Sequence, residues 1–359
     1  MTSVIESNRS EVERQGPQLN WHHCFVLSCL FMKELIKRTI VSTGALRLSS
    51  AGASTAIVMY HSVMEEPNQH SDSLGGIIHS ESQFRAQMEL LARNYHPISL
   101  DEVVKKLNAG ETLPKRSVVI TFDDGYTDNH EVAMPILDNV GIPATFYLTV
   151  DCVENRKLPW PSRLRFAFRT TRRPDWTDAQ GKAWDLSSPL SCEQAFLLAC
   201  DECCQLSGVA QEQFVTNVEN QLESRVPGEL SSLMMTFEQA RALARNGHIV
   251  GSHTMTHPNM AQINERDAEM ELAESKRRLE GELKIPVSHF SYPCPAMTPH
   301  WSEKTVVQSR AAGYISAVTT NGGVVRKGDK PLSLKRIRPT KTAAGLHWNM
   351  ECAFAGRVV

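Results

Sequence analysis

Two adjacent carboxylates follow a short apolar run in the first half of the chain. Residues 117–129 read SVVITFDDGYTDN, so Asp123 and Asp124 come directly after a segment with the composition of a buried strand. Asp-Asp-Gly is also ordinary turn chemistry, because Asp bonds its own backbone and Gly accepts a positive φ. The pair is therefore either a turn or a catalytic device on a rigid strand. In the second case one carboxylate binds a metal and its neighbour stays free as a base.

A second group of titratable side chains follows another predicted strand. Residues 248–252 read HIVGS, and the chain continues as HTMTHPNM, with His253 and His257 four residues apart. Two imidazoles at this spacing can converge in a helical turn or in a tight loop. In a β/α barrel, both groups would meet at the carboxyl ends of the strands, where barrel enzymes assemble their active sites. Carboxylate and imidazole are the donors of a catalytic metal site, which has three protein ligands and one position left for water.

The elements that must position these residues alternate between strands and helices. Apolar runs and turn signals predict strands at 56–60, 117–122, 144–150, 248–252, 287–292 and 314–320. Amphipathic patterns predict helices at 82–93, 100–107, 237–246, 264–283 and 302–312, with one more ending at 140 before Gly-Ile-Pro. Repeated alternation indicates parallel strands covered by helices. The expected fold class is α/β, a distorted (β/α) barrel of about seven parallel strands with a helical insertion.

The expected domain organisation has four parts. Residues 1–50 form an N-terminal leader and amphipathic helix, 51–153 and 233–345 form the barrel, 154–232 form a helical insertion, and 346–359 form a tail. The insertion shows no clear strand in its sequence. It either covers the site as a lid or adds packing on one flank.

The leader lacks the pattern of a signal peptide or a transmembrane helix. Its apolar run, 25–32, is too short to cross a bilayer, and acidic residues stand where a signal peptide is basic. Met32 is a plausible start, so we expect residues 1–31 to lie outside the fold. Packing of the following helix on the main domain is favoured over membrane-surface contact through 25–47. The compartment stays open, with a lean toward the cytoplasm.

Composition excludes some classes of function. The 359 residues are 41% hydrophobic and 22% charged, with a formal net charge of −2, which gives no support to nucleic-acid binding. The nine cysteines are scattered, which favours reduced thiols over a disulfide framework. Cys200, Cys203 and Cys204 lie closest together in the sequence. We expect them to be buried thiols on a helix rather than ligands of a zinc site. The oligomeric state is left open.

The two titratable motifs together resemble a known family. TFDDG, followed downstream by SHTMTHP, is similar to the polysaccharide deacetylases of carbohydrate esterase family 4, over roughly residues 56–338. The resemblance implies that Asp123 is the general base. It also implies a divalent metal, usually zinc and sometimes cobalt or manganese, on three ligands: Asp124, His253 and His257. The implied reaction hydrolyses the N-acetyl group of an N-acetylhexosamine-containing polysaccharide or oligosaccharide and releases acetate.

The departing amine needs a proton, and two histidines are candidates for its donor. His61 in VMYHSV follows the first predicted strand, and His347 in AGLHWNM lies beyond the last one. An early Tyr-His resembles the exopolysaccharide-type subgroup of the family, in which the acid comes from the N-terminal side. His61 is therefore the preferred acid, although a lone histidine at a strand end is often only structural.

The segment FSYPCP departs from the family's third motif. Tyr292 and Pro293 match the subgroup's Tyr-Pro-Asn-Gly, whereas Cys294 and Pro295 do not, and Ser291 stands where many members have an arginine. The resemblance implies that Tyr292, Pro293 and Cys294 belong to the segment that contacts the substrate and its oxyanion, and that the backbone N–H at Cys294 helps to hold the oxyanion.

The later segment SLKRIRP resembles the subgroup's closing Leu-Pro-Arg-Ile. Arg336 stands at the matching arginine. We expect it either to contact the substrate or to form an ion pair with Asp123.

Two other functions stay open at this point. One is a different metal-dependent, non-peptide amide hydrolase that acts on a ureide, a cyclic imide or an N-acyl sugar-lipid. The other is a non-catalytic glycan-binding relative, which the altered third motif would suit. Both metal-site motifs are intact, and this favours an enzyme.

Overall fold

The computed structural model describes residues 39, 52–294 and 299–357. The expected leader and amphipathic helix, 1–50, lie outside the described residues apart from Thr39, and so does Pro295. Among the described helices, none combines the length and the apolar character that crossing a membrane requires.

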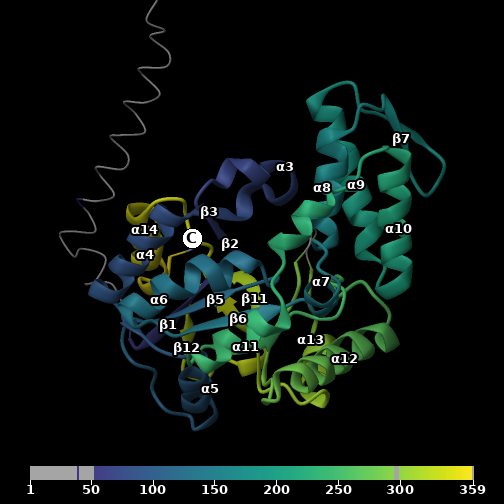
Figure 1. The fold of residues 1–359 in the computed structure, drawn as a ribbon. Coiled ribbons are helices and arrows are strands. Elements are labelled where there is room, and N and C mark those ends of the chain that lie inside the picture. The colour runs from purple at the N-terminus through teal and green to yellow at the C-terminus, as the bar shows by residue number, and fades with distance from the viewer. Residues whose placement is uncertain (1–38, 40–51, 295–298, 358–359) are drawn as a thin grey trace, which may run out of the picture.

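A nine-stranded sheet lies at the centre of the described part of the chain (Figure 1). Seven of its strands are parallel neighbours, in the order β1 (Ser54–Tyr60), β5 (Ser117–Phe122), β6 (Ala144–Leu148), β9 (Ile249–Ser252), β10 (His289–Ser291), β11 (Ser316–Gly322) and β13 (Leu334–Arg336). Two short strands complete it: β12 (Val325–Arg326), antiparallel to β1, and β4 (His96–Pro97), parallel to β5. A separate parallel pair joins β2 (Ser62–Met64) to β3 (Ile78–Ser80).

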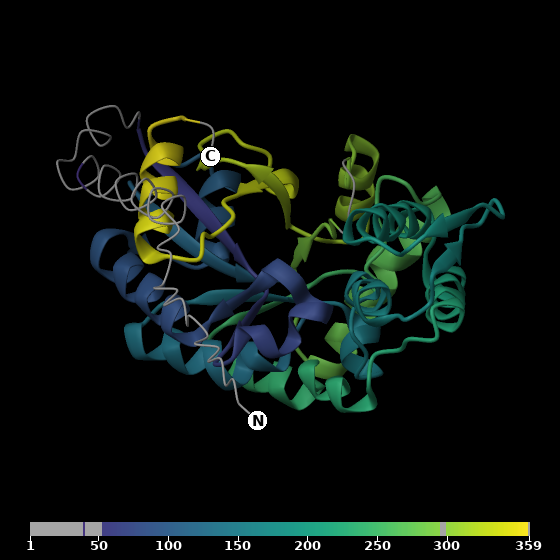
Figure 2. The ribbon, with the colours of Figure 1, turned by 90° about the horizontal axis from the view of Figure 1, so that it is seen from above.

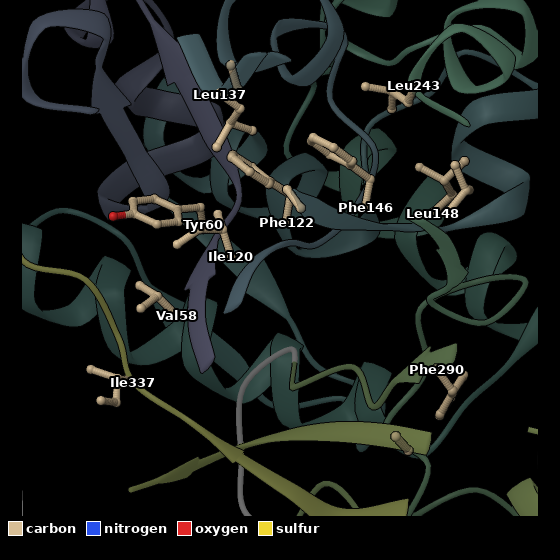
Figure 3. Close-up of a cluster of buried hydrophobic side chains, with 14 of the residues drawn as sticks. Val58, Tyr60, Ile120, Phe122, Leu137, Phe146, Leu148, Leu243, Phe290 and Ile337 are labelled. Carbon is tan, nitrogen blue, oxygen red and sulfur yellow. The ribbon is translucent and has the colours of Figure 1, made fainter. Parts of the chain in front are cut away.

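The residue after β13 closes the sheet into a barrel. The backbone N–H of Met59 donates to the carbonyl of Ile337 at 3.0 Å, and the N–H of Ile337 donates to the carbonyl of Ile57 at 2.7 Å. Figure 3 accordingly shows Val58 and Ile337 on neighbouring segments. The predicted α/β barrel of mostly parallel strands is confirmed.

Side-chain alternation along the strands separates an outer layer from the barrel interior. Val58, Tyr60, Ile120 and Phe122 belong to the core beneath the helices, where Phe122 stacks on Phe146 with ring centroids 4.8 Å apart (Figure 3). The alternate positions therefore face inward, because successive side chains of a strand point to opposite faces. On β5 this sequence of inward positions continues from Thr121 to Asp123, the residue just after the strand.

Helices cover the outside of the barrel. They are α4 (Glu81–Asn94), α6 (Met134–Val140), α11 (Phe237–Arg245), α12 (Glu265–Leu283), α13 (Glu303–Ala311) and α14 (Ala343–Phe354). Helix α5 (Leu100–Asn108) instead packs its buried residues with the inward-facing Ile57 and Val119. Short turns connect the helices and strands: η1 (Pro67–His70), α3 (Ser71–Leu74), η2 (Gly75–Ile77), η3 (Asn129–Ala133) and η5 (Pro331–Ser333). Capping boxes at Ser80, Thr236 and Ser302 begin three of the helices, and α6 ends at Gly141 with φ of 68°.

The segment expected to be a tail is part of the barrel. Residues 346–354 belong to α14, whose Leu346, Met350 and Phe354 are buried in the main core. Its apolar residues are spaced for one face of a helix, and that face covers β1 and α4. A boundary at 345 therefore divides a single packed helix.

The inserted segment forms a lobe on the side of the barrel opposite α14 (Figures 1 and 2). It contains α8 (Trp160–Thr170), α9 (Pro189–Cys204), α10 (Gly208–Gln221) and η4 (Gly228–Leu233). The short helix α7 (Val150–Glu154) precedes it and packs Val150 and Val153 into the main core. Cys200, Cys203 and Cys204 are buried in its own apolar core.

The expectation that the insertion has no strand is wrong. β7 (Asp175–Thr177) and β8 (Ala183–Asp185) form an antiparallel hairpin in which Trp176 pairs with Trp184. Each strand has only three residues, too few for a period-two pattern to be visible in the sequence. Burial of Trp176, which is 1% exposed, attaches the hairpin to the helices.

Candidate active site

A cavity of about 390 Å³ lies at the carboxyl ends of the barrel strands. Its lining includes six residues that the sequence identified: His61, Asp123, Asp124, His253, His257 and Cys294. They follow four different strands, so the barrel brings together groups that are far apart along the chain.

Asp123 forms a buried bidentate ion pair with Arg336. The distances are 2.8 Å from Nη1 to Oδ1 and 2.7 Å from Nη2 to Oδ2, and the two residues are 2% and 1% exposed. Burial is the largest single influence on Asp123 and would raise its pKa, but the charge and hydrogen bonds of Arg336, together with the neighbouring imidazoles, outweigh it, and the pKa lies below its usual value. Asp123 is therefore a carboxylate at neutral pH.

Arg336 is itself held in place from two other strands. Its Nε donates to the carbonyl of Thr319 at 2.8 Å, and Nη2 contacts Ser291 Oγ at 3.2 Å. Ser291 is the position at which many family members have an arginine. A guanidinium from β13 thus occupies the space beside a serine on β10, and of the two contacts expected for Arg336 the structure has the ion pair.

The backbone turns sharply after Asp123. Asp124 has φ of 76° and Gly125 has φ of 93°, both in the left-handed region. A Cβ at position 125 would lie 3.0 Å from Leu148 Cδ2 and 3.2 Å from Val153 Cγ2, so only glycine fits. A non-glycine residue in this region costs about 1–3 kcal/mol, and such strain clusters at functional sites. The Asp-Asp-Gly segment is therefore a tight turn that also separates the two carboxylates.

Asp124 faces two imidazoles. Its Oδ1 lies 3.5 Å from His253 Nε2 and 3.4 Å from His257 Nε2, and all three side chains are buried. His253 Nδ1 contacts the carbonyl of Ser291 at 2.8 Å, which assigns the proton to Nδ1 and leaves the lone pair of Nε2 directed at Asp124. Burial lowers the pKa of His253 to about 4, so this imidazole is neutral at pH 7.

These residues fit a divalent metal. Oδ1 of Asp124 is buried and accepts no hydrogen bond from any described residue, although two nitrogens lie close to it. One potential ligand atom from each residue lies within 4.8 Å of the others. One carboxylate oxygen and two imidazole nitrogens form a donor set that suits zinc and related ions. The cluster could therefore hold a metal through Asp124, His253 and His257.

The segment that carries the two histidines is a loop rather than a helical turn. Thr254 and His257 have φ of 69° and 63°, and both are strained for residues other than glycine. The indole of Trp160, at the start of α8, donates to the carbonyl of His257 at 2.9 Å. The inserted lobe therefore contacts the backbone of a candidate ligand.

Glu271 on α12 holds the same loop from the other side. Its Oε2 accepts from the N–H groups of Met255 at 2.7 Å and Thr256 at 3.0 Å, and its Oε1 accepts from the Thr256 hydroxyl at 2.6 Å. We did not identify Glu271 from the sequence. The available signal was a carboxylate on the buried stripe of a predicted helix, between Ala268 and Leu272.

The structure brings His61 to the cavity but not His347. The carbonyl of His61 accepts from Asn129 Nδ2 at 2.7 Å, so the end of β1 is attached to the segment after the two aspartates. His347 lies on α14, 3.4 Å from Glu351 and edge-on to Tyr95, and it does not line this cavity.

Among the third-motif residues that the structure describes, 291–294, only Cys294 lines the cavity. Tyr292 is buried, and its hydroxyl contacts Ser309 Oγ at 3.1 Å and the carbonyl of Leu332 at 3.2 Å. Its contacts are structural, and a role in binding substrate is not favoured by its position. Pro293 is likewise buried and absent from the lining.

The cavity also has basic residues that we did not identify from the sequence. They are His79 on β3, Arg165 on α8, and Arg338 and Lys341 after β13. None of them belongs to a local motif, and only the tertiary fold places them together.

A parallel barrel with acids, imidazoles and a cavity at its carboxyl end is the architecture of a barrel enzyme. The sequence model of the polysaccharide deacetylase family matches residues 110–176 and 211–315, and the unmatched residues between these segments lie in the insertion. YxkH of Bacillus subtilis (strain 168), provisionally named a polysaccharide deacetylase, is 20% identical over 294 residues, 82% of this chain and 74% of that protein.

Two further proteins extend this similarity. The poly-beta-1,6-N-acetyl-D-glucosamine N-deacetylase of Escherichia coli (strain K12) is 36% identical over 66 residues, 18% of this chain and 10% of that protein. The structure of the Streptococcus pyogenes deacetylase PplD in complex with acetate has a TM-score of 0.54 at 20% identity, and the match covers 84% of this chain and 99% of that one. The chain belongs to the polysaccharide deacetylase family, carbohydrate esterase family 4, and is a hydrolytic deacetylase.

Replacement of His257 tests the metal cluster. His257→Ala removes one of three ligand side chains, so the purified protein should lose bound metal, measured by elemental analysis. The control is His96→Ala, which removes an exposed imidazole outside the cavity and should leave metal content unchanged. Full metal occupancy in His257→Ala would contradict the assignment.

Replacement of Glu271 tests the support of the histidine loop. Glu271→Gln keeps the shape of the side chain but replaces one acceptor oxygen with a donor, which opposes the N–H groups of the loop. Metal affinity should fall by about 10–100-fold, the usual effect of losing a group that orients a ligand. Glu269→Gln, at an exposed position of the same helix, is the matched control. Equal metal affinities in the two variants would show that Glu271 does not position the ligands.

Proposed function

We propose that the protein uses a divalent metal to hydrolyse the N-acetyl group of an N-acetylhexosamine-containing polysaccharide or oligosaccharide. The observation that carries the proposal is the separation of roles between the two adjacent aspartates: Asp123 is ionised on Arg336, while Asp124 faces two imidazoles in the same cavity. The E. coli relative named for poly-beta-1,6-N-acetyl-D-glucosamine supports this class of substrate. An exopolysaccharide as substrate is part of the proposal.

Asp124, His253 and His257 would hold the metal. A bound metal supplies Lewis acidity, which polarises the amide carbonyl and acidifies water. Zinc is the favoured ion, with cobalt and manganese as alternatives, because the donor set combines one oxygen with two nitrogens.

Asp123 takes the proton of the attacking water as general base. The ion pair with Arg336 keeps the carboxylate ionised, so that it can accept a proton, and fixes its orientation toward the cavity, although the lowered pKa makes it a weaker base. The backbone N–H of Cys294, which lines the cavity, is proposed to donate to the developing negative charge on the substrate oxygen.

His61 protonates the departing amine. An unprotonated amine is a very poor leaving group, so a proton donor must line the cavity. His61 lines it, follows a strand of the barrel and is not part of the candidate metal cluster. Its backbone bond to Asn129 fixes where the side chain starts.

Replacement of Asp123 tests the proposed reaction. Metal-loaded wild-type protein should release acetate from an N-acetylglucosamine tetrasaccharide, and chelation should abolish this release. Asp123→Asn should retain metal but lower kcat by about 10²–10⁴-fold, because it removes the base. Loss of metal from this variant would indicate that Asp123 binds the metal and that Asp124 is the base. No acetate from any N-acetylated sugar would overturn the proposed function.

A second variant separates loss of the base from loss of the ion pair. Asp123→Asn leaves the guanidinium of Arg336 buried without an opposite charge, which costs about 3–5 kcal/mol of folding free energy. In the double variant with Arg336→Met neither charge remains, so stability should recover while kcat stays low. Recovery of kcat together with stability would assign Asp123 a structural role.

Replacement of His61 tests the proposed acid. His61→Ala keeps the backbone carbonyl that Asn129 uses, so the fold and metal content should be retained. The kcat for an N-acetyl amide should fall by about 10²–10⁴-fold. The loss should be smaller for an O-acetyl ester of the same sugar, because an alkoxide leaves more readily than an amide anion. Equal losses on both substrates, together with a lower melting temperature, would make His61 a structural residue.

A further inference from the structure

One wall of the active-site cavity has an excess of positive charge. Arg165 from α8 and Arg338 and Lys341 from the segment after β13 all line it. The carboxylates in the lining are Asp123, already neutralised by a guanidinium, and Asp124. Three cations therefore face one remaining carboxylate, in a protein whose formal net charge is −2.

Arg165 and Lys341 approach the same short segment from different parts of the chain. The Nζ of Lys341 donates to the carbonyl of Gly76 at 2.7 Å and also contacts the carbonyl of Ile78. The guanidinium of Arg165 lies over Gly75, where an added Cβ would be 3.1 Å from Nε and 3.2 Å from Cζ. Two like charges beside one glycine pair repel each other, and an anion bound between them would offset that repulsion.

The charge on this wall lacks the partners that cations elsewhere in the insertion have. Arg163, two residues before Arg165 on the same helix, forms ion pairs with Glu212 at 2.7 Å and Glu219 at 2.8 Å. Within the described part of the chain, neither Arg165 nor Lys341 has a carboxylate within ion-pair distance; Arg165 instead lies 5.0 Å from the ring centroid of Phe196. Burial lowers the pKa of Lys341, as expected for an ammonium that faces carbonyl oxygens alone.

We propose that the substrate carries an anionic group, a carboxylate or a phosphate, close to the N-acetylated sugar, and that Arg165, Arg338 and Lys341 bind it. The inference rests on the proposed deacetylase function and names the class of glycan as acidic. A guanidinium binds carboxylate and phosphate oxygens in a bidentate manner, and a lysine adds a compact charge.

His79 extends the same wall without adding charge. It is 4% exposed, and burial followed by the charge of Lys341 lowers its pKa to about 4, so it is neutral at pH 7. A neutral imidazole has one N–H to donate to an oxygen of the anion. The charge that selects the substrate therefore comes from the three cations.

Matched acidic and neutral substrates test the inference. The acidic one is a hyaluronan tetrasaccharide, in which glucuronate alternates with N-acetylglucosamine, and the neutral one is the same tetrasaccharide with its carboxylates reduced to alcohols. A 6-phosphorylated N-acetylglucosamine tetrasaccharide and its unphosphorylated form are the phosphate arm. We expect at least one acidic member to exceed its neutral partner by about tenfold or more in kcat/KM, because hydrogen bonds to charged groups are strong. The arm that shows the preference identifies the anion.

Variants connect the preference to the cations. Arg165→Gln and Lys341→Met should each reduce the acidic-to-neutral ratio of kcat/KM by about tenfold, mainly through a higher KM for the acidic form. High ionic strength should reduce the same ratio by screening. The control is Lys115→Gln, which removes an exposed charge before β5, outside the cavity, and should leave the ratio unchanged. Equal kcat/KM for acidic and neutral members, or a preference that survives both variants, would overturn the inference.

Calorimetric titration measures binding directly, so it separates failure of the anion site from failure of the proposed deacetylase function. If no tetrasaccharide releases acetate, the proposed function fails, but the acidic members should still bind more tightly than the neutral ones and lose that advantage in Arg165→Gln. Equal binding of both forms by the wild-type protein would reject the anion site on its own.

Discussion

The ion pair between Asp123 and Arg336 is the constraint on which the site depends. Both charges are buried, so neither can be lost without leaving the other unpaired, which costs about 3–5 kcal/mol. The guanidinium also contacts Thr319 on β11 and Ser291 on β10. One side chain therefore joins the ends of β5, β10, β11 and β13 inside the barrel, and the same contact keeps the pKa of Asp123 low. The ion pair that links these strands inside the barrel therefore also keeps the proposed base ionised.

The groups beside this ion pair sit on strained backbone. Asp124 and His257 both have positive φ, a conformation that is uncommon for any residue other than glycine. Contacts from outside the loop compensate for this strain. Glu271 binds three donors of the histidine loop, and Trp160 donates to the carbonyl of His257. A helix of the barrel and a helix of the insertion thus hold the same loop from different sides.

The insertion has a core of its own and still takes part in the site. Its helices bury Trp176 and the cysteines of α9 together, and this hydrophobic core stabilises the lobe. Arg165 of α8 lines the cavity, Trp160 at the start of the same helix donates to the carbonyl of His257, and α3 packs against that helix. The sequence left open whether this segment covers the site or packs on one flank of the barrel. Its contacts make it a side wall of the cavity, next to the candidate ligands.

The sequence by itself determined the barrel and the main candidate residues. Apolar runs and helical periods are local, so strands such as Ser117–Phe122 and helices such as Glu265–Leu283 follow from their own residues. The motifs TFDDG and SHTMTHP are local as well, and they placed Asp123, Asp124, His253 and His257 at strand ends, where the structure has them.

Only the tertiary structure decided which residues meet. Arg336 is 213 residues from Asp123, and the sequence left its contact open between substrate and ion pair. Arg165 and Lys341 had no local signal of function, because a basic residue on a helix or in a connecting segment is ordinary in itself. The signal for Glu271 was only its place on the buried stripe of a helix. The strands that carry Trp176 and Trp184 are too short for an alternating pattern to be recognised, and the segment that forms α14 was predicted to be a tail. Local structure is encoded by the spacing of neighbouring residues, whereas the charge and the support of a site come from contacts between distant segments, which exist only once the chain has folded.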